Sequence, residues 1–155
     1  MNIMTSEINN ESVSQNYLGF WARFGASFID SIMLLLITIP LIYSIYGGDY
    51  WTSREIILGP AELLINYVLP IAAIILFWLY KSTTPGKMVY KAKIVDAKTG
   101  RALSARQSII RYIAYYVSLL PFGLGFFWVA WDPKKQGWHD KLAGTVVVRE
   151  PNNEI

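Results

Sequence analysis

The chain has 155 residues and a formal net charge of +3, and hydrophobic residues make up 54% of it against 16% for charged residues. The apolar content is above the average of soluble proteins and the charged content is below it, which is the composition of a membrane protein. The lack of cysteine excludes disulfides, thiolate metal sites and a cysteine nucleophile. We expect one domain, because no internal repeat divides a chain of this length.

The first 16 residues predict a disordered tail, followed by a membrane domain over residues 17–149 and a second short tail over residues 150–155. The first tail carries Glu7 and Glu11, has no lysine or arginine, and is rich in serine and asparagine. A secretory signal peptide would begin with basic residues, so we expect the first hydrophobic segment to be retained.

Two predicted helices, residues 19–46 and 58–80, are long enough to cross a bilayer, which takes about 20 mostly apolar residues. Residues 24–46 contain Asp30 as their only charge, and residues 63–80 contain none. The segment between the two helices holds glycine and proline, which are typical of a loop, and it is more acidic than basic.

A third hydrophobic region, residues 105–131, is interrupted by the stretch LLPFGLGFF. Pro121 lacks an amide hydrogen and the two nearby glycines are conformationally permissive, so we expect the helix to break there. Two arrangements remain open: a kinked helix that crosses the membrane, or a re-entrant hairpin that returns to its starting side. Ser104 and Gln107 have the spacing of a capping box and predict where the helix begins.

The distribution of lysine and arginine predicts the orientation. Residues 81–106 contain seven of these cations against one acid, Asp96. Short loops rich in lysine and arginine stay in the cytoplasm. Because two spanning helices precede this segment, the N-terminus is then expected in the cytoplasm as well. Residues 87–95 and 145–149 each predict a strand, and two isolated strands are most stable when paired. Pairing requires both strands on one side, which favours the re-entrant hairpin, since membranes tolerate a broken backbone that protein covers.

Three stretches stand out in chain order: GFWARFGASFIDSIMLLL, STTPGKMVYKAKIVDAKTG and IRYIAYYVSLLPFGLGFFWVAWDPKKQGWHDKLAGTVVV. Together they resemble the RDD family of small bacterial membrane proteins, which is named for an arginine and two aspartates. The resemblance implies that Arg23 is the arginine and Asp30 the first aspartate. It implies Asp140 in WHDKLAGT as the second aspartate, with Asp132 in WDPKKQG as the alternative.

The function implied by the resemblance is transport of unknown ligands, and some family members resemble exchangers of monovalent cations for protons. The implied ligands are then Na⁺, K⁺, Li⁺ or H⁺. The resemblance also implies a multi-pass protein of the bacterial cell membrane, that is, the inner or plasma membrane.

Asp30 is the first candidate for an ion or proton pathway. At 1.5 Å per residue it lies about 15 Å below Phe20, near the expected bilayer midplane, where an ionised carboxylate costs about 3 kcal/mol. Three states are open: a structural pair with Arg111 that fixes helix register, a bound ion or proton from the transport cycle, or a neutral acid. Arg23, two turns earlier, is expected to extend to lipid phosphate at the interface.

Glu62 and Asn66 are the second candidate, because residues spaced i and i+4 share one helix face. Their oxygens are the hard ligands that small cations prefer, and Pro70 frees the carbonyl of Asn66 as a further acceptor. The alternative is an interhelical hydrogen bond worth about 1 kcal/mol or less.

The sequence thus predicts an all-α membrane protein with two full transmembrane helices, a broken third element and a small cytoplasmic pair of strands. The predicted function is transport, as exchange of monovalent cations for protons at Asp30; the alternative is a non-catalytic membrane scaffold or accessory subunit with structural charges.

We expect no enzyme activity, because a hydrolase using His139 and Asp140 would need a supported nucleophile. We also expect no cofactor, metal or nucleic acid. Ala22 and Ala26 predict a homo-oligomer through close helix contact.

Overall fold

The computed structural model of the chain describes residues 16–150. The predicted tails, residues 1–16 and 150–155, lie outside this range except for Asn16 and Glu150 at its two ends. The described part is mostly helical, with one small two-stranded sheet.

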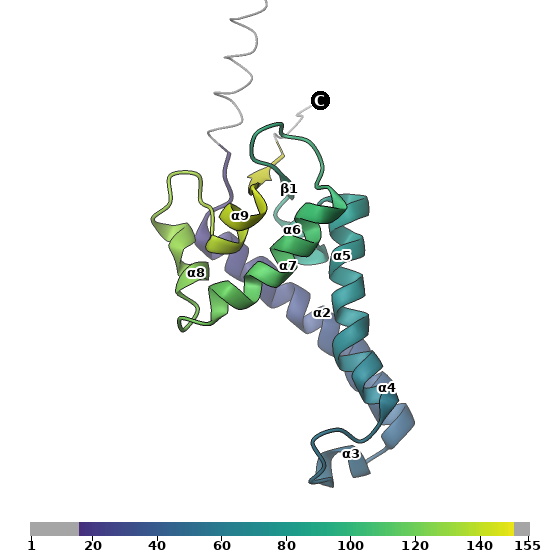
Figure 1. The fold of residues 1–155 in the computed structure, drawn as a ribbon. Coiled ribbons are helices and arrows are strands. Elements are labelled where there is room, and N and C mark those ends of the chain that lie inside the picture. The colour runs from purple at the N-terminus through teal and green to yellow at the C-terminus, as the bar shows by residue number, and fades with distance from the viewer. Residues whose placement is uncertain (1–15, 151–155) are drawn as a thin grey trace, which may run out of the picture.

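Two long apolar helices run in opposite directions; they lie together at the end near α4 and diverge toward the other end (Figure 1). The first is α2, Phe20–Tyr46, and the second is continuous over α4 (Pro60–Leu63), the π-helical turn η1 (Leu64–Val68) and α5 (Leu69–Lys81). The short helix α3, Asp49–Thr52, lies in the loop that joins them. Both helices are long and apolar enough to cross a membrane, and only a small share of each is covered by protein.

Pro70 accounts for the π-helical turn inside the second long helix. Because proline has no N–H, it cannot donate to the carbonyl of Asn66. The N–H of Leu69 bonds instead to the carbonyl of Leu64, five residues back, which is the π pattern.

The third hydrophobic region is two short helices joined by a sharp bend. Helix α7, Ala105–Leu119, begins with the predicted capping box, in which Ser104 and Gln107 each bond the other's backbone N–H. The chain then bends by 111° before α8 (Leu124–Phe127) and the 3₁₀ turn η2, Trp128–Ala130.

The two predicted strands pair with each other. Strand β1, Ala92–Asp96, runs antiparallel to β2, Thr145–Arg149, with Ile94 opposite Val147. The prediction of a strand over residues 87–95 is wrong in its first half, where the chain forms helix α6, Pro85–Val89. Local start signals explain the difference, since the side chain of Thr84 caps the helix and proline occupies its first position.

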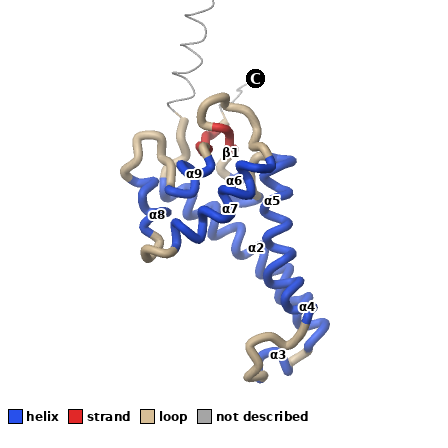
Figure 2. The backbone as a smooth tube through the Cα atoms, in the orientation of Figure 1, coloured by secondary structure: helices blue, strands red, loops and turns tan. Residues whose placement is uncertain are grey.

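The buried core lies where the ends of these elements meet. Figure 2 shows β1, α6, α7 and α9 (Trp138–Ala143) gathered at one end of the long helices, with α3 at the other. The residues before α2 join this layer, because the N–H of Leu18 bonds to the carbonyl of Val147 at 2.9 Å. The core cluster is formed by buried apolar residues from five segments: Leu18, Trp78, Ala92, Ile94, Leu103 and Val147. The molecule therefore has a compact layer from which two apolar helices project.

Candidate functional site

Asp140 is the centre of a buried cluster of charges. It lies in the first turn of α9, where its carboxylate accepts a hydrogen bond from the N–H of Gly137 at 2.9 Å. An acid in the first turn of a helix is favoured by the free N–H groups there. The Asp140 side chain is fully buried, so a charged carboxylate at this place needs cationic partners.

Two arginines from different helices bind the two oxygens of this carboxylate. Arg23 in α2 places Nη1 2.5 Å from Oδ2, and Arg111 in α7 pairs through Nη1 with Oδ1. Arg111 also donates to the hydroxyl of Thr145 at the start of β2. Asp140 thus ties α2, α7 and α9 together, and we name Arg23, Arg111 and Asp140 the arginine–aspartate cluster.

The guanidinium groups are held in place by aromatic and backbone contacts. The Cζ of Arg111 lies 5.4 Å from the ring centre of Trp78 and 5.8 Å from that of Tyr115, distances at which a cation is attracted to a ring face. Arg23 Nε donates to the carbonyl of Leu18 at 2.9 Å. Nη2 of Arg23 and Nε of Arg111 are buried and have no hydrogen-bond partner among residues 16–150.

Burial and charge act in opposite directions on Asp140. Burial alone would raise the pKa of its carboxyl, but the guanidiniums of Arg111 and Arg23 hold that pKa well below its usual range. For the neighbouring His139, burial lowers the pKa to about 3, aided by the nearby arginines and opposed by Asp140. The imidazole is therefore neutral near pH 7, and its ring packs against Tyr115 with the two ring centres 4.5 Å apart.

We expect His139 to make stability depend on pH in mildly acidic solution. The folded state keeps this imidazole neutral down to about pH 3, whereas the unfolded state binds a proton below about pH 6.5. Stability is then lost as pH falls through this window, by about 1.4 kcal/mol per unit. The measurement is denaturant unfolding in detergent between pH 6.5 and 5.

His139 is the only histidine of the chain, so the matched variant for this test is His139→Gln. The variant is expected to be less stable at every pH but to show a flatter pH dependence in the same window. Equal slopes for wild type and variant would contradict the assignment.

Asp30 binds the segment that leads into α6. Its carboxylate accepts the hydroxyl of Thr84 at 2.5 Å and the N–H of Gly86 at 2.6 Å. Glycine is the only residue type that fits at position 86, because a Cβ atom there would collide with the backbone oxygen of Ala26. Asp30 therefore fastens α6 against α2 at a point of direct backbone contact.

Lys87 is a buried cation beside Asp30. Its Nζ lies 3.4 Å from the hydroxyl of Thr84, and among the described residues no carboxylate is within ion-pair distance of it. Burial lowers the pKa of Lys87 to about 8, with Arg111 adding to this effect and Asp30 opposing it. Thr84 thus stands between the ammonium of Lys87 and the carboxylate of Asp30.

Of the three states left open for Asp30, the pair with Arg111 is wrong, because Arg111 binds Asp140 instead. Within the fold, Asp30 lies where α2 meets α6, next to the compact layer. At the far end of the helix pair the Tyr46 hydroxyl accepts the N–H of Glu62.

The small face of α2 is occupied within the chain. Ala26 is fully buried beneath Gly86, and Ala22 packs on the core cluster. The reason given for a homo-oligomer is therefore wrong, since a second copy cannot reach Ala26.

Glu62 and Asn66 lie at the other end of the helix pair and do not join Asp30. The Glu62 carboxylate accepts the N–H of Leu58 at 2.7 Å and the hydroxyl of Tyr50 at 3.3 Å. Asn66 donates to the same hydroxyl at 3.3 Å. These side chains therefore hold the loop that contains α3, and the interhelical hydrogen bond of the alternative interpretation is not what they form.

Asp132 forms a separate site from the arginine–aspartate cluster. It pairs with Lys141 and accepts the N–H groups of Lys134 and Gln136, each at 3.1 Å. Asp140, not Asp132, is thus the aspartate that meets Arg23. Sequence reasoning missed the roles of Thr84 and Thr145, although the Thr-Pro-Gly run was a readable helix start.

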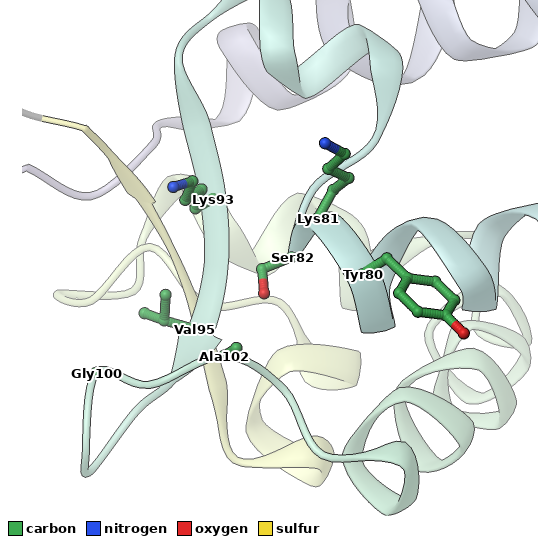
Figure 3. A pocket seen from close by; sticks show the side chains of 7 residues that line it. All are labelled: Tyr80, Lys81, Ser82, Lys93, Val95, Gly100 and Ala102. Atoms are coloured by element: carbon green, nitrogen blue, oxygen red, sulfur yellow. The ribbon is translucent and has the colours of Figure 1, made fainter.

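A recess of about 320 Å³ lies at the end of α5, on the side of the layer next to β1, and Figure 3 shows the side chains that line it. In that view the Tyr80 ring points away from the recess. Lys93 is paired with Glu150. The recess is lined by Tyr80, Lys81, Ser82, Lys93, Val95, Gly100 and Ala102, and it is separate from the arginine–aspartate cluster. Within residues 16–150 no three His, Asp or Glu side chains are grouped closely enough to hold a metal ion.

Several proteins similar to this chain are described as uncharacterized. An uncharacterized protein of Rickettsia prowazekii is 44% identical over 75 residues, which is 48% of this chain and 41% of that protein. The uncharacterized protein YxaI of Bacillus subtilis is 31% identical over 84% of this chain and 95% of its own length. The uncharacterized membrane protein YteJ of the same organism is 29% identical over 90% of this chain and 85% of its own length. No solved structure matches.

The family comparison covers almost all of the described chain, since residues 17–144 match the RDD family. With the two long apolar helices and a relative described as a membrane protein, this match indicates a membrane protein. The chain belongs to the RDD family.

Proposed function

We propose that the protein is a non-catalytic membrane scaffold or accessory subunit whose buried charges are structural. One observation carries this proposal: Asp30 and Asp140 each bind groups from segments distant in the sequence. Asp30 reaches Thr84 and Gly86, and Asp140 binds Arg23 from 117 residues away. Carboxylates used in this way organise a layer and have few free oxygens for a transported ion.

The compact layer is the surface that such a subunit would offer to a partner. It stands at one end of the two long helices, and six of the seven cations of residues 81–106 are exposed on it, all except the buried Lys87. By the positive-inside rule this layer and the N-terminus lie in the cytoplasm, with the helices crossing the bacterial cell membrane as a hairpin. An acidic partner fits this charge.

The second candidate is exchange of monovalent cations for protons at Asp30. It is favoured by one feature: Asp30 is only partly buried and lies next to Thr84 and the ammonium of Lys87. A small cation could replace that ammonium as the countercharge of the carboxylate. Two spanning helices are too few to enclose a water-filled path, so this function would need further copies of the chain.

Everted membrane vesicles separate the two functions. Under the scaffold proposal, added Na⁺, K⁺ or Li⁺ causes no proton movement beyond that of vesicles lacking the protein. Asp30→Asn then loosens α6, because charged hydrogen bonds worth about 1 to 3 kcal/mol each are lost. The readout is trypsin cleavage at Lys87, which is buried in the wild type.

The matched control is Asp49→Asn, because Asp49 is exposed in the loop between the long helices. It should leave trypsin cleavage unchanged. Cation-driven proton movement that persists in Asp49→Asn and disappears in Asp30→Asn would instead establish exchange and refute the scaffold proposal.

A further inference from the structure

Helix α7 is amphipathic in the reverse of the usual sense. Its buried face is mainly polar and consists of Ser108, Arg111, Ala114 and Ser118. Its exposed face is apolar and consists of Ile109, Ile113, Tyr116, Val117 and Leu119. A helix at the surface of a soluble protein places its apolar side chains inward, so the surroundings of this helix are not water.

The exposed apolar face continues past the end of α7. Phe122 at the bend is 98% exposed, and Leu124, Phe127 and Trp128 are also exposed. The ring of Phe127 stacks on that of Phe20 at 5.4 Å between centres, which joins this surface to α2. The start of α2 adds its own exposed aromatics, Trp21, Phe24 and Phe28.

Both ends of this bent element belong to the same layer. The residues just before α7 are bridged to β1 through Ala102 and Val95, and the residues after η2 lead into α9 and β2. Because β2 pairs with β1, the two ends of the bent element lie on the same side and cannot be separated by a hydrocarbon core about 30 Å thick. Figure 1 shows α7 sloping away from the sheet to the bend and α8 running back; a Cβ on Gly125 would touch the backbone of Ser118.

We propose that the outer face of α7 and α8 binds the acyl chains of one bilayer leaflet, so that this element dips into the membrane and returns. The leaflet is the one on the side of the sheet. Continuity with the apolar surface of α2 identifies lipid as the occupant. The polar face of α7 is turned away from lipid, where Arg111 meets Asp140.

Cations stand where this element would meet lipid headgroups. Lys141 Nζ lies 5.7 Å from the ring centre of Trp128, and Lys135 donates to the carbonyl of Ala130 at 3.1 Å. Tryptophan with lysine is typical of the boundary between acyl chains and headgroups. The deepest point is then the bend at Phe122.

The chain lacks cysteine, so single nitroxide labels can be placed without other changes. We would label Ile113→Cys and Phe122→Cys in the full chain in liposomes of phosphatidylcholine and phosphatidylglycerol. The reference positions are Leu36→Cys, exposed in the middle of α2, and Thr99→Cys, exposed in the loop after β1. The measurement compares collision rates with oxygen, which dissolves in lipid, and with a nickel chelate, which stays in water.

The expected ratio of oxygen to nickel collisions rises several-fold from Thr99 through Ile113 to Phe122 and approaches the value at Leu36. A ratio at Phe122 equal to that at Thr99 would show a surface in water and overturn the proposal. Spin–spin broadening at Ile113 or Phe122 that vanishes on dilution with unlabelled protein would assign the face to a second copy instead. If the nickel chelate reached the label at Phe122 better from the side of the membrane opposite Thr99, the element would cross the membrane completely, which would also overturn the proposal. These results do not depend on whether the protein exchanges ions.

Discussion

Asp140→Asn is expected to remove most of the folded protein from the membrane. The change neutralises a fully buried carboxylate and leaves the guanidiniums of Arg23 and Arg111 without their common counter-charge. Removing one member of a buried ion pair costs about 3 to 5 kcal/mol, which is a large part of the stability of a small domain. The measurement is the amount of protein in isolated membranes together with its resistance to protease in detergent.

The matched control is Glu150→Gln, which breaks the ion pair with Lys93. Both of those side chains are about half exposed, so the expected cost is at most about 1 kcal/mol. The double change Asp140→Asn with Arg111→Met should recover part of the lost protein, because it removes one stranded cation. Wild-type abundance and protease resistance in Asp140→Asn alone would show that the arginine–aspartate cluster does not hold the layer together.

Gly86→Ala is expected to have the second largest effect, through shape and not charge. The added methyl group would collide with the carbonyl oxygen of Ala26, which belongs to a helix backbone and cannot rotate away. Overpacking of this kind costs about 1 to 3 kcal/mol or more. Helix α6 should separate from α2, and trypsin should then cut after Lys87.

Gly48→Ala is the control for this substitution. A Cβ there meets nothing within 4 Å and the residue has an ordinary helical φ of −69°, so cleavage should stay at the wild-type level. If Gly86→Ala were as resistant to trypsin as the wild type, the close contact of α6 with α2 would have to be abandoned.

Signals within one short stretch predicted much of the fold. Residues 24–46 and 63–80 are apolar for long enough to require a helix that a bilayer can cover. Pro121 indicated the bend because proline lacks the N–H that would continue the helix. Ser104 indicated the start of α7 because it forms a capping box with Gln107, three residues later.

Choice of partner was not predictable in the same way. Asp30 and Asp140 offered Arg111 two acids of the same charge, and only the packing of α7 against α9 decides between them. The contact of Asp30 with α6 was not predictable for a related reason, because Gly86 lies 56 residues further along the chain. Contacts between residues so far apart in the chain leave no local pattern.

The hydrogen bonds that join the two ends of the described chain constrain its biogenesis. Leu18 bonds to Val147 at 2.9 Å and Asn16 to Arg149 at 2.8 Å, so the layer closes only after residues 145–149 have been synthesised. Arg23 in α2 is made well before its partner Asp140. Both long helices are therefore complete before the pair of Arg23 with Asp140 can form, and the closing of the layer is a late step of assembly.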